Sequence, residues 1–286
     1  MHTFYVGDRA IQYRRTGSGP PVVLTPGGRL GYSALASLAR ALEDHMQLIE
    51  WDRSNTGSSD LYLDTRPEQY RWADDAALLL EHLGLGSAIF IGGSAGARLA
   101  YLTAIRHPQV VSGLILWSVS GGGYSSQLLG YQYHTPYIEA AVRGGMAQVA
   151  ETPHFSELIR ANPGNAARLL DLDPSTFIAV MKSWNNVFYP TMATPVIAAT
   201  VSELRAVTAP TLVFNGNDDF HPDFAAQALH EAIPGSRLLP CAWTREDWML
   251  RYVGRIPESV VELYPRMSEP IIDHIREISP EGQAAR

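Results

Sequence analysis

Apolar and polar positions along the chain follow two periods, one typical of strands and the other of helices. Residues 3–6 and 10–15 flank Gly7-Asp8, and the second segment alternates apolar with polar residues, which predicts an antiparallel hairpin. Residues 21–25 (PVVLT) are continuously apolar, as in a strand covered on both faces. Leucines then recur at helical spacing over 32–42, behind Ser33 as a candidate helix cap.

The same strand and helix pattern repeats further along the chain. Strands are expected over 47–51, 88–92 and 113–118, and helices over 67–83 and 96–106. Alternating strands and helices with short connections predict an α/β fold, in which a mostly parallel twisted sheet carries helices on both faces. Ligand sites in such sheets lie at the carboxyl ends of the strands.

A helical segment interrupts this pattern between residues 121 and 206. The strand signal returns at 210–216, followed by a helix near 224–232, a short strand near 236–240 and a closing helix over 269–278. Because one sheet must draw strands from both sides of the interruption, we expect an α/β core made of 1–120 and 207–286. The helical cap of 121–206 would then cover the carboxyl edge of the sheet.

Composition narrows the range of partners. The 286 residues are 46% hydrophobic, so the chain can bury a full core, and the formal charge of −7 without a basic cluster argues against nucleic acid. No apolar run approaches the ~18 residues needed to span a membrane, and the first residues lack a secretory signal, which predicts a cytoplasmic protein. Cys241 is the only cysteine, so neither an internal disulfide nor a thiolate metal cluster is expected. Association into a homo-oligomer is left open.

The segment Gly92-Gly93-Ser94-Ala95-Gly96 is the strongest chemical signal. This G-x-S-x-G pattern follows an apolar strand and opens a helix, which is the arrangement of a nucleophile elbow. Such a turn strains the serine backbone, needs glycines beside it, and places the serine at a helix N-terminus that favours negative charge. The alternative is that Ser94 only caps the helix.

A second glycine loop, Thr25-Pro26-Gly27-Gly28-Arg29, supports the elbow. An oxyanion hole in this architecture needs the N–H after the nucleophile, here that of Ala95, and one from the loop after an earlier strand, here that of Gly28. Two arginines lie beside this chemistry. Arg29 and Arg98 could bind a substrate carboxylate, or they could pair with Asp52 or Asp60.

With these motifs the chain resembles the α/β-hydrolase fold superfamily over nearly its whole length. The resemblance rests on GGSAG, VVLTPGG, DRSNTGSSD and PTLVFNGNDDFHP, and within the superfamily it points to a poorly characterised branch that shares the TPGGR loop. Pro26 replaces the histidine usual before the first loop glycine. Asp52 and Arg53 fall in a turn common in the superfamily and are expected to fix the loop conformation.

The resemblance also directs attention to the acid and the base. Relatives carry the acid three residues after the glycine that ends the late strand, which gives Asp219, with Asp218 as an alternative shifted by one residue. The usual Gly-His pair after the last strand is absent. His221, in the late-strand loop, is the best remaining base, and Glu246 or Asp247 could orient it in place of Asp219. His221 could instead only mark the start of a helix beside Pro222.

These residues imply a serine hydrolase. The expected activity is esterase-like or C–C-bond hydrolysis of a small, partly apolar carbonyl compound through an acyl-serine intermediate, with no metal or organic cofactor. Two cap histidines, His134 and His154, could contact the substrate. A hydrolase fold used only to bind ligands, or a cofactor-free lyase, are the alternatives, since a fold alone does not choose among them.

Overall fold

An eight-stranded, mostly parallel sheet forms the centre of the molecule. The computed structural model describes residues 1–189, 194–255 and 259–279. The strands lie in the order β1-β2-β4-β3-β5-β6-β7-β8, with β1 and β2 antiparallel and the remainder parallel, so the predicted α/β fold and its N-terminal hairpin are confirmed. Their bounds are β1 His2–Val6, β2 Arg9–Thr16, β3 Pro21–Thr25, β4 Gln47–Asp52, β5 Ala88–Gly93, β6 Val111–Trp117, β7 Thr211–Phe214 and β8 Arg237–Leu239.

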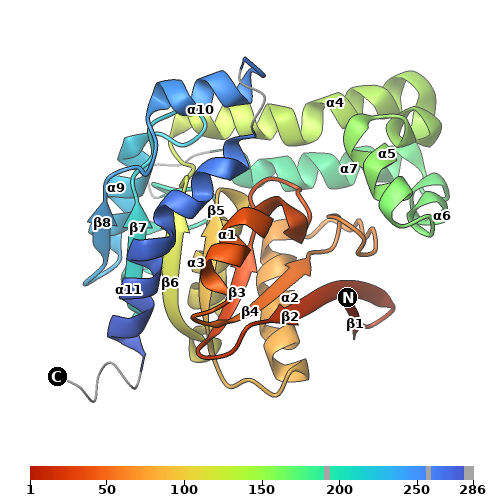
Figure 1. Cartoon of the computed structure of the whole chain (residues 1–286). Coiled ribbons are helices and arrows are strands. Elements are labelled where there is room, and N and C mark those ends of the chain that lie inside the picture. The colour runs from red at the N-terminus through yellow and green to blue at the C-terminus, as the bar shows by residue number, and fades with distance from the viewer. Residues whose placement is uncertain (190–193, 256–258, 280–286) are drawn as a thin grey trace.

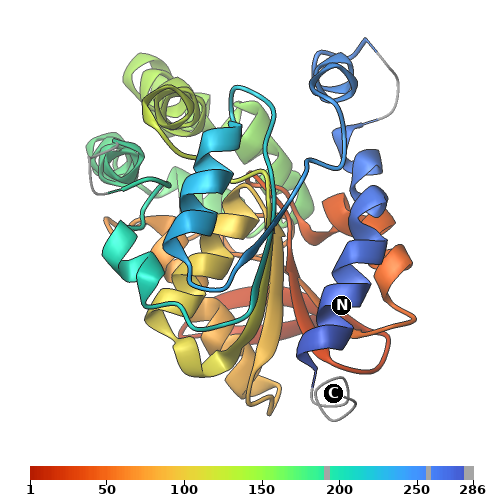
Figure 2. The same cartoon turned by 90° about the vertical axis from the view of Figure 1, so that its left-hand side faces the viewer.

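Helices cover both faces of the sheet (Figure 2). The helices α2 Glu68–His82, α3 Ala95–Arg106 and α9 Asp223–Ala232 pack on one face with the short α8 Val201–Arg205. On the other face lie α1 Ala36–Leu42 and α11 Ser268–Ile278. The central strands β3 and β5 are buried on both sides, which explains their unbroken apolar sequences.

One helix start differs from its prediction. The 3₁₀ turn η1 Tyr32–Leu35 precedes α1, so Ser33 lies inside that turn, and Gly31 at its start makes no side-chain capping bond. The reason is tertiary: the carboxylate of Asp52 accepts a hydrogen bond from the backbone N–H of Tyr32 at 2.8 Å and thereby satisfies a donor at this end.

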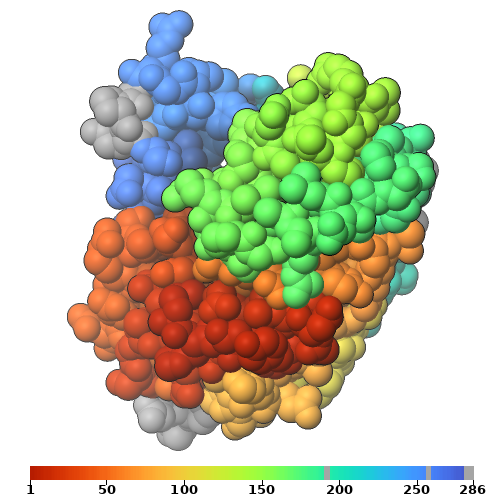
Figure 3. Space-filling view, turned by 90° about the vertical axis from the view of Figure 1, so that its right-hand side faces the viewer, coloured from red at the N-terminus to blue at the C-terminus, as the bar shows by residue number. Residues whose placement is uncertain are grey.

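Four helices between β6 and β7 lie across the carboxyl end of the sheet (Figure 1). They are α4 Gly123–Ala150, α5 Pro153–Ala161, α6 Asn165–Leu170 and α7 Pro174–Asn185, all within the segment predicted to form a cap. They share a small hydrophobic core of their own that includes Phe155, Phe177 and Trp184. Figure 3 shows this group, in green, resting on the N-terminal part of the chain.

Polar contacts fix these helices to the loop that follows β4. The Asn165 side chain accepts a hydrogen bond from the N–H of Leu61 at 2.7 Å, and Arg168 pairs with Asp60 at 2.8 Å. The indole N–H of Trp184 donates to the carbonyl oxygen of Asp64 at 2.7 Å. One of these bonds is buried and two are partly buried, and together they hold α6 and α7 against the loop.

A second cover over the same edge comes from the C-terminal part of the chain. This cover consists of the helix α10 Arg245–Tyr252 and the 3₁₀ segment η4 Val260–Met267. Figure 1 shows α10 at the top of the molecule, and Figure 2 shows that it stands apart from α4. The sequence did not predict a helix over 245–252, because three of its apolar residues are consecutive (Trp248, Met249 and Leu250) and the stretch shows no strong helical period. Among the described residues, no helix combines the length and apolar character needed to cross a membrane.

Candidate active site

Ser94 lies on a strained turn between β5 and α3. Its φ and ψ angles are +53° and −112°, a conformation that non-glycine residues rarely adopt, as the elbow prediction required. Glycine is required at positions 92 and 96, because neighbouring backbone atoms leave no room there for a side chain. A Cβ on Gly96 would lie 2.2 Å from the carbonyl oxygen of Thr25, and one on Gly92 would lie 2.4 Å from the carbonyl carbon of Gly96.

His221 lies within hydrogen-bond reach of this serine. Its Nε2 is 3.0 Å from the Ser94 Oγ, and its Nδ1 is 3.0 Å from a carboxylate oxygen of Asp218. Asp218 and His221 are both buried. A hydroxyl, an imidazole and a carboxylate therefore form one hydrogen-bonded chain at the carboxyl edge of the sheet, and this geometry can make a serine nucleophilic.

The carboxylate beside His221 corrects the assignment made from the sequence. Asp219, the favoured acid, is half-exposed and pairs with Arg245 at 2.9 Å. The alternative acids are also placed elsewhere: Glu246 is exposed, and Asp247 pairs with Arg251 and Arg266. Asp218, the alternative shifted by one residue, is the carboxylate that contacts the ring.

Local hydrogen bonds explain why Asp218 takes this position. One of its carboxylate oxygens accepts the backbone N–H groups of Phe220 and His221 at 2.8 and 3.0 Å, which folds the loop into a compact turn. The other oxygen is then left facing the imidazole of the residue three positions later. Gly216 allows the tight fold, because a Cβ there would lie 2.0 Å from the carbonyl oxygen of His221.

The glycine loop after β3 lies against Ser94. A Cβ on Gly27 would lie 3.2 Å from the Cβ of Ser94, and Gly28 has a φ of +54°, which favours glycine. Within the described parts of the chain, the N–H groups of Gly28 and Ala95 donate no hydrogen bond. Both predicted oxyanion donors are therefore free of protein partners.

The turn after β4 supports that glycine loop from behind. Arg53 donates from Nη2 to the carbonyl oxygens of Gly28 and Leu30 at 3.1 and 3.2 Å, while Asp52 accepts from the backbone and hydroxyl of Ser58 at 2.8 and 3.0 Å. These contacts match the structural role expected for Asp52 and Arg53. Burial lowers the pKa of Arg53 to about 10, which leaves its guanidinium charged at neutral pH.

Arg29 lines the cavity above Ser94, where a substrate contact remains a prediction, whereas Arg98 does not line it. The Arg29 guanidinium is buried against Glu68, with nitrogen–oxygen distances of 2.9 and 2.8 Å, and it donates to the backbone oxygen of Tyr133 at 3.0 Å. It therefore joins the glycine loop to α2 and α4. Arg98 is buried with its guanidinium 4.8 Å from the centre of the Phe188 ring. The pairing with Asp52 or Asp60 is not formed by either arginine among the described contacts.

A cavity of about 360 Å³ opens directly above Ser94 and His221. Its walls come from the glycine loop, from α4, from α10 and from η4, so it lies between the two covers of the sheet edge. The lining is mainly apolar and aromatic, and its large side chains are Leu30, Trp117, Leu129, Tyr133, Phe220, Trp248, Tyr252, Val260 and Tyr264. A pocket of this size and character suits a small, partly apolar molecule.

The two cap histidines do not line this cavity. His134 is buried, its Nδ1 lies 3.0 Å from the carbonyl oxygen of Gly130, and burial lowers its pKa to about 3. His154 is packed among Tyr137 and Phe155, and burial lowers its pKa as well. Both side chains belong to the packing of the cap.

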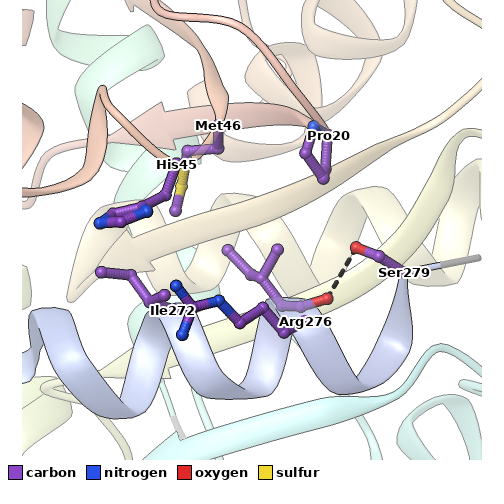
Figure 4. A pocket seen from close by; sticks show the side chains of 7 residues that line it. Pro20, His45, Met46, Ile272, Arg276 and Ser279 are labelled. Atoms are coloured by element: carbon purple, nitrogen blue, oxygen red, sulfur yellow. Dashed lines mark hydrogen bonds between the residues drawn. The ribbon is translucent and has the colours of Figure 1, made fainter. Parts of the chain in front are cut away.

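Another pocket lies at the amino ends of the strands and lacks comparable chemistry (Figure 4). Its volume is about 300 Å³, and it is bounded by Pro20, His45, Met46 and one side of α11. Its Ser279 hydroxyl donates to the carbonyl oxygen of Ile275 at 2.7 Å, a bond that closes the end of that helix. The site around Ser94 is therefore the better candidate for a reaction centre.

Fold and site together place the chain in a known class. Residues 20–239 match the family model of the alpha/beta hydrolase fold, and the chain belongs to that family. Within it, the chain is 27% identical over 256 residues to 2-hydroxymuconate semialdehyde hydrolase from Pseudomonas putida, a match covering 86% of this chain and 85% of the relative.

Solved structures show the same fold at lower sequence identity. The enol-lactonase from Burkholderia xenovorans superposes with a TM-score of 0.64 at 19% identity, covering 96% of this chain and all of that chain (100%). A thermophilic esterase from Thermogutta terrifontis gives a TM-score of 0.62 at 20% identity, covering 94% of both chains. The resemblance to the family is thus confirmed, while the branch marked by the TPGGR loop stays a prediction.

Proposed function

We propose that this chain is a serine hydrolase that acts through an acyl-serine intermediate. Its substrate is a small, partly apolar ester, lactone or carbonyl compound with a cleavable C–C bond. The observation that carries the proposal is the hydrogen-bonded chain from Ser94 through His221 to Asp218, with the serine held at a strained elbow. The hydrolases among the relatives support the same reaction class.

In the first half-reaction the Ser94 oxygen attacks the substrate carbonyl carbon while Nε2 of His221 takes the hydroxyl proton. Asp218 holds Nδ1 and stabilises the imidazolium that forms. The negative charge that develops on the carbonyl oxygen would be met by the N–H groups of Gly28 and Ala95 and by the N-terminus of α3. Collapse of this intermediate breaks the bond to the leaving group, which receives the proton from His221.

In the second half-reaction a water molecule attacks the acyl-serine ester. His221 removes the proton of that water, the tetrahedral intermediate forms in the same oxyanion hole, and Ser94 leaves with its proton restored. Every proton moves through one imidazole, so the proposed cycle needs no metal or organic cofactor. The aromatic lining of the cavity would hold the apolar part of the acyl or leaving group.

Labelling with a fluorophosphonate tests the proposal, because this probe requires an activated serine. We expect one adduct per chain, at Ser94, and turnover of at least one class in a panel of p-nitrophenyl esters and lactones. Ser94→Ala should abolish both, and circular dichroism would show that the fold is retained. Absence of labelling in the unaltered protein would instead support a protein that only binds ligands.

The cytoplasmic location predicted from the sequence is a separate question, and cell fractionation would test it.

A further inference from the structure

The cap helix α4 presents a free hydroxyl to the proposed oxyanion hole. Tyr133 lines the cavity above Ser94, and its hydroxyl oxygen lies 3.7 Å from the position that a Cβ on Gly28 would occupy. In the described parts of the chain this hydroxyl has no hydrogen-bond partner. A phenol hydroxyl that is free, lines the cavity and lies close to Gly28 has a donor available for a substrate atom.

Tyr133 is held firmly enough to direct that hydroxyl. Its backbone oxygen accepts from Arg29 at 3.0 Å, and the same guanidinium lies 5.6 Å from the centre of its ring. The ring also packs edge-on against Phe188, with the ring centres 5.9 Å apart. Arg29 is the residue after Gly28, so its hydrogen bond to the backbone oxygen of Tyr133 ties the tyrosine to the glycine loop.

The charges around the hydroxyl favour a developing anion. The positive charges of three arginines, Arg29, Arg53 and Arg98, lower the pKa of the Tyr133 hydroxyl. Among the described residues that affect this pKa, Glu68 is the carboxylate with the opposite effect. Burial raises the pKa of Tyr133 and outweighs the opposite effect of the three arginines, so the phenol keeps its proton at neutral pH and can donate it. Excess positive charge in a dry site stabilises negative charge on a bound oxygen.

We propose that the Tyr133 hydroxyl is a third hydrogen-bond donor to the oxyanion, supplied by the cap alongside the backbone N–H groups of Gly28 and Ala95. It would donate to the carbonyl oxygen most strongly when that oxygen becomes negative in the tetrahedral intermediate. No proton is transferred from the phenol. The inference rests on the proposed function, because it assigns an additional catalytic residue to the same reaction.

Tyr133→Phe is the direct test, since it removes one oxygen that has no protein partner. We expect kcat to fall about 10- to 100-fold with KM within about threefold, somewhat less than the loss usual for one oxyanion donor. A trifluoromethyl ketone that forms a charged tetrahedral adduct with Ser94 should bind the variant at least 10-fold more weakly. The matching methyl ketone should bind both proteins about equally, because it stays uncharged.

Tyr137→Phe is the matched control. Tyr137 lies one turn further along α4 and its ring is 5.7 Å from the same Arg29 guanidinium, but it does not line the cavity. We expect its kcat and inhibitor affinity to match those of the unaltered protein. Fluorophosphonate labelling of Ser94 should remain complete in both variants, since the serine and its base are untouched.

The outcomes separate the two proposals. If the unaltered protein is not labelled, the hydrolase proposal fails and the role of Tyr133 fails with it. If labelling and turnover are normal but Tyr133→Phe leaves kcat and trifluoromethyl ketone affinity unchanged, only the third donor is overturned. A rise in KM with unchanged kcat would also overturn it, because it would show that the hydroxyl binds the ground state alone.

Discussion

At the scale of single residues, two adjacent aspartates have opposite surroundings. Asp218 is buried and bonded to His221, whereas the neighbouring Asp219 is half-exposed and bonded to Arg245. Their one-residue separation turns the two carboxylates away from each other within a single turn. They are therefore a matched pair for testing which of them orients the proposed base.

Replacing each aspartate by asparagine should give very different enzymes. Asp218→Asn should lower kcat/KM by roughly 10⁴-fold, because an amide can stabilise neither the required tautomer nor the imidazolium. Asp219→Asn should change kcat/KM by less than about twofold, since it removes only an exposed ion pair. Steady-state hydrolysis with one p-nitrophenyl ester measures both. Equal losses in the two variants, or a large loss in Asp219→Asn alone, would contradict the assignment of Asp218.

Some residues of the candidate site could be predicted from the sequence and others could not. Local patterns predict Ser94, Gly28 and Ala95, because a nucleophile elbow and a glycine loop are written in consecutive residues. His221 is predicted by elimination, since no other histidine follows a strand at the carboxyl edge of the sheet. The choice of Asp218 over Asp219 depends on which carboxylate accepts the backbone N–H groups of its own turn, a detail that spacing alone does not fix. The contact of Arg29 with Glu68 could not be predicted from the sequence either, because it joins residues 39 positions apart that only the tertiary fold brings together.

At the scale of elements, α10 occupies the place where a histidine is expected in the superfamily. Its Trp248 and Tyr252 rings stack with centres 4.7 Å apart, and both line the cavity. Trp248 also packs edge-on against His221, with a centre separation of 6.2 Å. The segment in which the superfamily resemblance places a histidine therefore forms an aromatic wall of the cavity above Ser94.

Tyr252→Ala should alter substrate preference more than catalysis. We expect kcat/KM for an ester with an aromatic acyl group to fall about 3- to 10-fold, through loss of ring contacts, and kcat/KM for an acetate ester to change less. Tyr131→Ala is the control, because Tyr131 is similarly exposed, lies on α4 and does not line this cavity. Competition between the two esters measures the preference directly, and an unchanged ratio in Tyr252→Ala would remove α10 from the specificity site.

At the scale of the whole molecule, histidines whose pKa values are lowered in the folded state link stability to pH. Burial lowers the pKa of His134 to about 3, and it also lowers the pKa values of His154 and His274. The folded chain therefore holds these rings neutral while the unfolded chain protonates them near pH 6.5. Stability is fully present above that pH and is lost as the pH falls toward the folded-state pKa.

We expect the free energy of unfolding to drop by about 2 kcal/mol between pH 7 and pH 5 from His134 alone. Urea denaturation at the two pH values measures the drop in the unaltered protein and in His134→Gln. The variant should be less stable at pH 7 but should show a drop smaller by about that amount. The same pH dependence in both proteins would mean that His134 is protonated in the folded state.

The placement of both partners of Ser94 in one short loop has a consequence for how this protein could change over time. The proposed acid and base, Asp218 and His221, lie within four consecutive positions, and the hydrogen bond between them needs no other segment. Under the proposed mechanism, the stretch from residue 241 to 264 does not have to supply a proton carrier. Recombination or insertion there could alter which molecules are accepted while the reaction machinery is inherited intact, which makes this region a natural target for directed evolution of new substrates.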